Sequence, residues 1–398
     1  GRARAVVELL SARLNRQKNS PAVIPPTIAQ IRQVAKARNA TLVEYSVIDE
    51  ENLYIWVVQP MGAVTARSVD LKPFLESPKI TLADYVRRVR AKGIGTRGVG
   101  LAPTSLPQPN ADLKALHQLL IDPIADLLPT NPNDRVIFIP QGALFLVPFA
   151  ALQSAQGEYL IQKHTLLTAP SIQVLELTQT RKPSNASASL IVGNPTMPKL
   201  VLVPGEPAEQ LPELPGAEVE ARAIAELLKT SALIGDRATK ATVKDQMQKS
   251  RLIHLATHGI LDDQRGIGSA IALAPSSGKL TASSESDDGL LTAEEILDLK
   301  LNADLVVLSA CDTGRGRITG DGVIGLSRSL ISAGTPSVIV SLWAVPDAPT
   351  ASLMQEFYRN LQQNPDKAQA LRQAMLTTMQ QNPSPRDWAG FTLIGAAE

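Results

Sequence analysis

The chain contains a single cysteine, Cys311, among 398 residues. One cysteine cannot form an internal disulfide, and the N-terminus shows no signal-peptide apolar region, so we expect a reducing, cytoplasmic setting. The charges nearly cancel, with 39 basic and 38 acidic residues. Such a balance provides no field that would attract nucleic acid or an anionic membrane. No apolar run approaches the roughly 18 residues of a membrane-spanning helix, so we expect neither a nucleic-acid nor a membrane partner.

The first 38 residues are predicted to be N-terminal helices. Apolar residues recur with helical periodicity over 2–17 and, after a proline-rich connection, over Ile28–Arg38. The chain begins at Gly1 without an initiator methionine, which suggests a fragment of a longer polypeptide. One interpretation of residues 1–38 is therefore the tail of a helical repeat array.

Residues 39–180 are predicted to form a smaller α/β subdomain. Two alternating runs, 41–48 and 53–59, flank four polar residues, a pattern typical of a hairpin. Helices and a strand are then predicted at 82–91, 111–127 and Arg135–Ile139. This part of the chain offers no nucleophile, so we expect it to be a non-catalytic companion of the residues that follow.

Residues 190–398 show a regular alternation of strands and helices, which is typical of a doubly wound, mostly parallel sheet. Six strands of parallel type are predicted at 190–193, 231–234, 252–257, 305–310, 337–343 and 391–394. Helices are predicted at 217–228, 240–249, 292–297, 323–332, 349–362 and 367–380. The polar segment 276–289 lacks periodicity, and we expect it to be a mobile loop.

Cys311 stands where an open α/β sheet places its chemistry, beyond the carboxyl ends of parallel strands. It follows the apolar strand at 305–310, and His258 follows the apolar strand at 252–257. A cysteine nucleophile needs a base, and a histidine can take the thiol proton and pass it on. The alternative interpretation is that Cys311 is a small, buried apolar residue, as lone cysteines often are.

Spacing and motifs support the catalytic interpretation. His258 precedes Cys311 by 53 residues (311 − 258), and caspase-type proteases carry their histidine about 50 residues before the cysteine. Further motifs are LPGAE at 214–218, HLATHG at 254–259, GLLTAEEI at 289–296, LSACDTG at 308–314, GDGVIGLSR at 320–328, VSLWAVPD at 340–347, and, upstream, FIPQGALFLVPFA at 138–150 and YLI at 159–161. Together they resemble the CHAT family, caspase-like domains associated with tetratricopeptide repeats and related to separases and caspases.

The resemblance implies a caspase-like fold over 190–398, preceded by a pseudo-protease subdomain at 39–180. It also implies a cysteine endopeptidase that forms an acyl-enzyme on Cys311, with His258 as base and acid. The N–H groups of Gly259 and Cys311 would form the oxyanion hole. A protein substrate and a regulatory protein or helical repeats are the implied partners. No metal or organic cofactor is implied.

Specificity stays open at the level of the sequence. The resemblance places a wall of the S1 pocket in the segment after the strand that follows the nucleophile, which contains Trp343, Ala344 and Asp347. Separases, which cut after arginine, carry an acidic residue directly after the tryptophan, whereas this chain has Ala344. Asp347 and Asp312 would still suit a basic P1 residue, and a small or apolar P1 residue is the alternative.

His254 and His258 superficially echo a zinc motif. The segment is predicted to be a strand, however, and four residues along a strand span roughly 13 Å, too far for one metal ion. We therefore expect no metal site there, and a buried, hydrogen-bonded core role for His254.

Two other functions remain open. In the first, a caspase-like fold with an idle dyad serves as a signalling scaffold. In the second, a thiol hydrolase acts on a small ester or amide, which would require a closed apolar pocket in place of an open groove.

Overall fold

The computed structural model describes thirteen stretches of the chain: 6–8, 10–11, 24–48, 51–74, 81–93, 109–179, 186–201, 207–260, 269–276, 288–309, 311–312, 320–343 and 345–398. Within them, side chains are described except at 88, 90–93, 109–110, 311–312 and 320–324. Of the helix predicted at 2–17, residues 6–8 and 10–11 are helical, and the rest lies outside the described residues, as does most of the loop predicted at 276–289.

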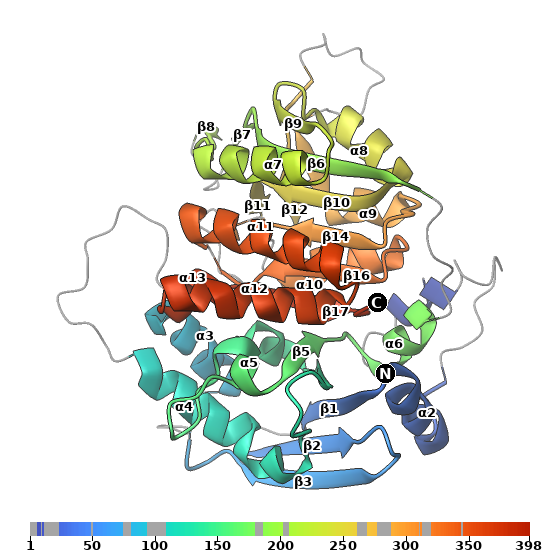
Figure 1. The fold of residues 1–398 in the computed structure, drawn as a ribbon, viewed down its shortest axis with the longest axis vertical. Coiled ribbons are helices and arrows are strands. Elements are labelled where there is room, and N and C mark those ends of the chain that lie inside the picture. The colour runs from blue at the N-terminus through green and yellow to red at the C-terminus, as the bar shows by residue number, and fades with distance from the viewer. Residues whose placement is uncertain are drawn as a thin grey trace.

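The described strands build one large, mostly parallel sheet of eleven strands (Figure 1). Its order is β3 (Val64–Asp70), β2 (Asn52–Val58), β1 (Ala40–Val47), β4 (Arg135–Ile139), β5 (Thr165–Thr168), β17 (Phe391–Gly395), β16 (Ser337–Ser341), β14 (Leu305–Leu308), β10 (Ser250–Ala256), β6 (Ala188–Pro195) and β9 (Ala232–Gly235). All six strands predicted in 190–398 belong to it, which confirms the fold class of that part.

One predicted strand runs in the wrong direction. β17 is antiparallel to β16, with Phe391 opposite Ser341, whereas a strand of parallel type was predicted. The reason is the connection. A single crossover helix returns the chain to the amino edge of a sheet, but here two packed helices, α11 (Asp347–Gln363) and α12 (Lys367–Gln381), separate the strands. After two helices the chain is again at the carboxyl edge of the sheet. β17 therefore starts at this edge and runs antiparallel to β16.

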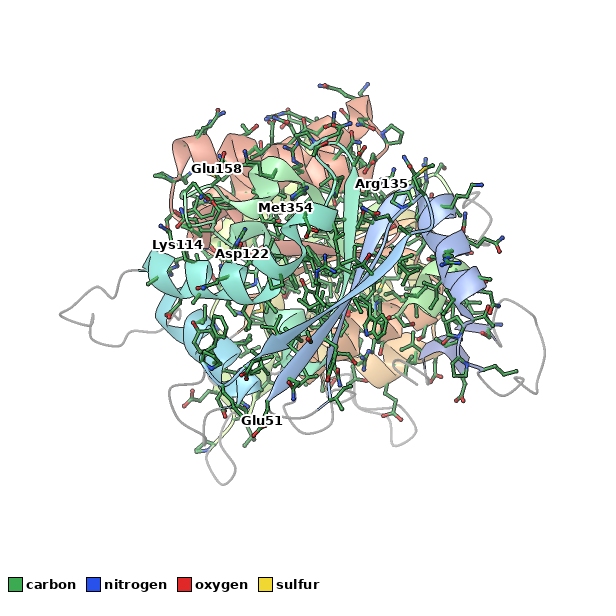
Figure 2. All side chains as sticks on the ribbon, turned by 90° about the horizontal axis from the view of Figure 1, so that it is seen from below. Glu51, Lys114, Asp122, Arg135, Glu158 and Met354 are labelled. Atoms are coloured by element: carbon green, nitrogen blue, oxygen red, sulfur yellow. The ribbon has the colours of Figure 1, made fainter. Side chains whose placement is uncertain are left out.

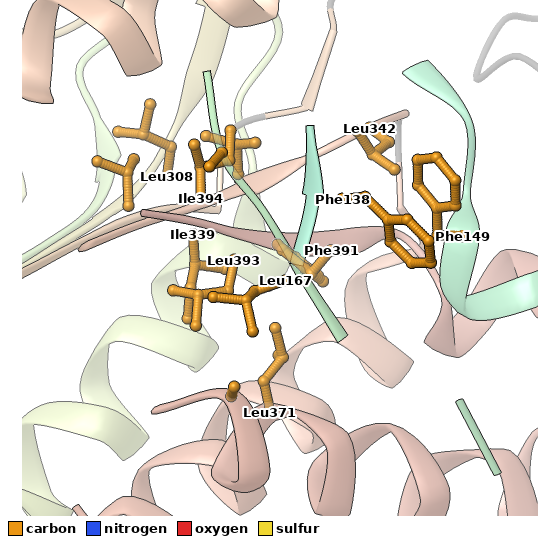
Figure 3. Close-up of a cluster of buried hydrophobic side chains, with 14 of the residues drawn as sticks. Phe138, Phe149, Leu167, Leu308, Ile339, Leu342, Leu371, Phe391, Leu393 and Ile394 are labelled. Carbon is orange, nitrogen blue, oxygen red and sulfur yellow. The ribbon is translucent and has the colours of Figure 1, made fainter. Parts of the chain in front are cut away.

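The sheet does not stop at the predicted boundary near residue 180. β17 pairs in parallel with β5, through Ile394 and Thr168, and so joins the six C-terminal strands to the five N-terminal ones. The buried side chains at this junction form one cluster, to which Phe138, Leu167, Ile339 and Leu393 contribute from both sides (Figure 3).

Helices cover both faces of the sheet. In the N-terminal part they are α2 (Ile28–Arg38), α3 (Leu82–Gly93), α4 (Pro109–Leu120), α5 (Leu160–Lys163), α6 (Ile172–Gln179) and the 3-10 helices η1 (Asp122–Leu127), η2 (Gly142–Leu146) and η3 (Phe149–Ala151). In the C-terminal part, α7 (Pro215–Leu227) lies with α11 and α12 on one face, and α8 (Lys240–Lys249), α9 (Ala293–Asp298) and α10 (Gly320–Ser332) lie on the other (Figure 1). A short α13 (Pro385–Trp388) precedes β17.

The helix predictions are largely confirmed. Residues 28–38 form α2 with the predicted bounds, and all six helices predicted in 190–398 are present within a few residues. The helix predicted over 111–127 is wrong in its second half, because α4 ends at Leu120 and a 3-10 helix containing Pro123 follows. Proline lacks the N–H group that a continuing α-helix requires.

A second, small sheet lies where β10 and β14 end. Its order is β13 (Leu290–Thr292), β12 (Ala270–Ala272), β11 (His258–Ile260) and β15 (Cys311–Asp312). A separate ribbon pairs β7 (Lys199–Leu200) with β8 (Glu209–Gln210). The small sheet was not predicted, because strands of two or three residues carry no periodicity.

In the part of the chain that the structure describes, no helix combines the length and the apolar character needed to cross a bilayer.

Candidate active site

The backbone brings His258 and Cys311 directly opposite each other. β10 and β14 are parallel neighbours, with Leu252 opposite Leu305, as expected for the strands that lead to the two residues. Beyond them, β11 pairs in parallel with β15, so that His258 is the register partner of Cys311 and Gly259 that of Asp312. Neighbouring strands lie about 4.8 Å apart. The two candidate catalytic residues are therefore adjacent in the fold, although 53 positions separate them in the sequence.

The imidazole of His258 is held by a main-chain acceptor. The side chain is buried, and its Nε2 atom lies 2.7 Å from the carbonyl oxygen of Pro212, in the segment that precedes α7. A carbonyl oxygen can only accept, so Nε2 carries a proton and donates it in this hydrogen bond. In the neutral ring, Nδ1 is then the basic nitrogen.

Gly259 lies inside the small sheet. It is buried and is the register partner of Ile271 on one side and of Asp312 on the other. The glycine therefore stands at the same sheet edge as the histidine and cysteine positions, where the oxyanion-hole hypothesis requires it.

His254 is a core residue, as predicted. Its ring is fully buried between α7 and α11, with Nε2 2.9 Å from Glu220 Oε1 and Nδ1 3.0 Å from the hydroxyl of Tyr358. A carboxylate only accepts, so in the neutral ring Nε2 donates to Glu220 and Nδ1 accepts from Tyr358. Burial, with a smaller effect of the Glu220 charge, raises the pKa of Tyr358 well above its usual value. The hydroxyl therefore stays protonated and remains a donor.

A small cavity of about 20 Å³ opens beside this histidine network, at the carboxyl ends of β10 and β14. Its polar lining comes from Glu220, Thr257, Ser309, Asp347 and Thr350, and its apolar lining from Leu214, Ala217 and Val345. This volume accommodates about one water molecule and no amino-acid side chain.

Asp347 reaches the cavity past a glycine. A Cβ atom added to Gly216 would lie 2.2 Å from Asp347 Cβ and 2.6 Å from its Oδ2. Only glycine therefore lets the first turn of α7 approach the start of α11 so closely. Of the polar residues in this cavity, Asp347 was predicted from the sequence, whereas Ser309 and Glu220 were not. Two signals were present: Ser309 stands two residues before Cys311, and Gly216 belongs to the LPGAE motif.

The other predicted specificity residues are Trp343, Ala344 and Asp312, and none of them lines this cavity in the described residues. Trp343 is buried, and its indole N–H donates to the carbonyl oxygen of Arg386 at 3.1 Å, so the ring contacts the segment that forms α13. Ala344 lies outside the described residues. Only the backbone of Asp312 is described, and it lies opposite Gly259.

Among the side chains that the structure describes, no group of three or more His, Cys, Asp or Glu could hold a metal ion.

The fold and the facing cysteine and histidine positions define a caspase-like α/β protein. A family model of the CHAT domain matches residues 110–396, and the chain belongs to this family. Tetratricopeptide repeat protein 28 is 31% identical in Mus musculus and 32% in Homo sapiens, over 348 residues and 76% of this chain. The chain spans 14% of the length of these relatives.

Among solved structures, the Saccharomyces cerevisiae separase–securin complex is similar in fold. The match covers 92% of this chain and 30% of the chain it matches, with a TM-score of 0.52 and 10% identity. At this identity the likeness concerns the fold alone.

The His254 network yields a stability prediction. Replacing Tyr358 by Phe removes the donor to Nδ1 and leaves a buried acceptor without a partner, which should lower the free energy of unfolding by about 1–3 kcal/mol. Denaturation in guanidinium chloride would measure the change. Tyr54→Phe in β2, whose hydroxyl has no described hydrogen bond, is the matched control and should change stability by less than about 0.5 kcal/mol. Equal stability of the two variants would contradict the network.

Proposed function

We propose that this chain is a cysteine endopeptidase in which Cys311 and His258 form the catalytic dyad. The observation that carries the proposal is the register of β11 and β15, which pairs the one thiol-bearing residue with a buried histidine at the carboxyl edge of the sheet. This edge is where open α/β sheets bind and transform their ligands.

In the proposed reaction, Nδ1 of His258 takes the proton of the Cys311 thiol, and the thiolate attacks the scissile carbonyl carbon. The hydrogen bond from Nε2 to the Pro212 carbonyl stabilises the imidazolium that forms. The N–H groups of Gly259 and Cys311 would hold the oxyanion. The imidazolium then gives its proton to the leaving amine, and water, deprotonated by His258, hydrolyses the thioester.

We further propose that the cavity beside the dyad is the base of the S1 pocket. Asp347 and Glu220 line it, and two carboxylates favour a basic P1 side chain over a small or apolar one. In this proposal Trp343 belongs to the wall of the S1 pocket, and Asp312 lies next to Cys311, the nucleophile. Since about 20 Å³ holds no side chain, the pocket has to widen when substrate or a partner binds.

Regulation by a partner fits the small volume of this cavity. The curated relatives are named for tetratricopeptide repeats, and the separase structure is a complex with securin. By analogy, we propose that helical repeats or a regulatory protein control this domain and deliver a protein substrate to it in the cytoplasm. We retain residues 1–38 as N-terminal helices, 39–180 as a non-catalytic subdomain and 190–398 as the catalytic one.

The rival function is a signalling scaffold with an idle dyad. The specific observation in its favour is the small volume of the same cavity, together with the burial of His258. A P1 side chain cannot enter a cavity of about 20 Å³.

A library of peptide acyloxymethyl ketones that differ in P1 should separate the two functions. We expect covalent labelling of Cys311, seen as an increase in intact mass, because a thiolate activated by His258 attacks such ketones. His258→Ala should slow labelling by at least about 100-fold, in the range typical of general-base contributions. Wild-type protein that resists every probe, in the presence of its repeats or partner as well as alone, would favour the scaffold.

The same library tests the S1 proposal. Replacing Asp347 by Asn should reduce labelling by probes with P1 arginine by about tenfold or more, because one charge partner of the guanidinium is lost. Labelling by probes with P1 alanine should change little. Asp245→Asn, on exposed α8, is the control and should leave both rates unchanged. A parallel loss for both classes of probe would show that Asp347 has a structural role.

A further inference from the structure

Asn194 has an unusual backbone conformation at the same edge of the sheet as the candidate dyad. It lies near the carboxyl end of β6, where Gly193 pairs with Ala256 of β10, the strand that leads to His258. Its φ angle is 43°, in the left-handed region that residues with a side chain rarely adopt. Glycine would adopt this conformation without strain, so we expect the asparagine side chain to make contacts that glycine lacks.

A β-bulge redirects the Asn194 side chain. Gly193 pairs with Ile234 of β9, and Pro195 pairs with Gly235, so Asn194 is the extra residue between the two pairs. A bulge takes the extra residue out of the regular alternation of the strand and aims its side chain elsewhere. Here the side chain meets α7, which packs on β6.

The side chain of Asn194 binds the beginning of α7 at two points. Its Oδ1 atom accepts a hydrogen bond from the N–H group of Leu214, at 2.8 Å. Its amide also donates to the carboxylate of Glu218, whose pKa is lowered by Arg222 first and by Asn194 to a smaller degree. Leu214 is the N-cap residue of α7 and has no capping side chain, and Glu218 belongs to the first turn. Asn194 therefore fixes the start of this helix from the neighbouring strand.

The position of the Pro212 carbonyl depends on this anchor. Pro212 is exposed and, as a proline, has no N–H group through which its own main chain could be held. On one side, the N–H group of Leu211 donates to the carbonyl oxygen of Pro198 at 3.2 Å. On the other side, the N–H group of Leu214 donates to Asn194. The turn that carries Pro212 is thus held on both sides, and on the helix side by one side chain.

This turn controls the imidazole of His258. The Pro212 carbonyl accepts from Nε2 at 2.7 Å and thereby selects the tautomer in which Nδ1 is the basic nitrogen. If the turn moved away, this selection would be lost, and the neutral ring would populate both tautomers. Nδ1, which takes the thiol proton in the proposed reaction, would then already carry a proton in part of the molecules.

We propose that Asn194 is a positioning residue for His258. Its side chain anchors the turn 212–214, and the turn holds the Pro212 carbonyl where it binds Nε2–H. Asn194 acts through this turn and takes no part in the chemical steps. The positioning is a property of the fold, whereas its effect on Cys311 rests on the proposed dyad, so each has a measurement of its own.

Replacing Asn194 by glycine tests the positioning, because glycine keeps the positive φ angle and removes only the amide. Nuclear magnetic resonance of the whole chain, labelled with ¹⁵N-histidine, reads the tautomer of His258, and His258→Ala assigns its signals among the four histidines. A Cys311→Ser background at about pH 8.5 keeps the ring neutral, since free imidazole titrates at about 6.5. We expect Nε2–H alone with Asn194 present, and at least about one quarter Nδ1–H in Asn194→Gly.

Alkylation of Cys311 by iodoacetamide measures the consequence for the thiol. In Asn194→Gly the pH of the inflection should rise toward the value of a free thiol, about 8.5, by at least about 0.5 relative to the wild type. A residue with a structural role alone would lower stability and leave the inflection where it is.

Asn39→Gly is the matched control. Asn39 ends α2 with the same φ angle of 43°, and its side chain has no described hydrogen bond. It precedes β1, in the N-terminal part of the sheet, where Arg135, labelled in Figure 2, donates to the carbonyl oxygen of Arg38 at 3.3 Å. β4, β5, β17, β16, β14 and β10 lie between β1 and β6. The tautomer and the inflection should both stay as in the wild type.

A paired exchange provides the rescue. Asn194→Asp keeps the acceptor for Leu214 but places a second carboxylate beside Glu218, so it should change the tautomer as Asn194→Gly does. Glu218→Gln in the same chain restores one donor and one acceptor between the two side chains. The double variant should return to within about 10% of the wild-type tautomer population.

The outcomes separate the two hypotheses. A wild-type tautomer in Asn194→Gly, or a double variant without rescue, would overturn the proposed role of Asn194. A mixed tautomer in Asn194→Gly, together with an alkylation inflection of about 8.5 in every protein, would support the positioning and contradict the proposed dyad.

Discussion

The parallel pairing of β10 with β14 is the constraint on which the candidate site depends. Both are interior strands of the sheet with helices on each face, and Ile253, Leu255, Val306 and Val307 are fully buried. Val306 and Val307 point to opposite faces and both are buried, so a slip of one residue would force each side chain into a place packed for its neighbour, and close packing on both faces therefore fixes the register. Because the register is fixed, the residues that follow the two strands must also meet, and these are His258 and Cys311.

Three further features of the structure hold His258 and Cys311 in place. The carbonyl of Pro212 orients the imidazole of His258, and the Glu220–His254–Tyr358 network joins β10, the strand that leads to His258, to α7 and α11. The small sheet extends both strands past the edge of the large one. Any change that separates α7 from α11 would therefore disturb the candidate S1 cavity as well as the core.

Much of this arrangement could be predicted from the sequence, and the exceptions have physical reasons. Long, periodic helices and strands were predicted correctly, because burial of one face imposes their pattern. The direction of β17 was missed, since a sequence does not show that α11 and α12 form a hairpin. The continuation of the sheet through β5 was missed because four residues are too few to show alternation. In the site, the facing of His258 and Cys311 followed from topology, whereas Ser309, Glu220 and the Pro212 carbonyl meet only through tertiary packing.

The most direct test of the account is the pH dependence of Cys311 alkylation by iodoacetamide, because the chain has no other thiol to confuse the signal. If the dyad is assembled, the rate should rise with an inflection clearly below about 8.5, the value of a free thiol, because imidazolium stabilises the thiolate. In His258→Asn the inflection should return to about 8.5 or higher. Identical profiles in both proteins, with an inflection near 8.5, would contradict the central claim.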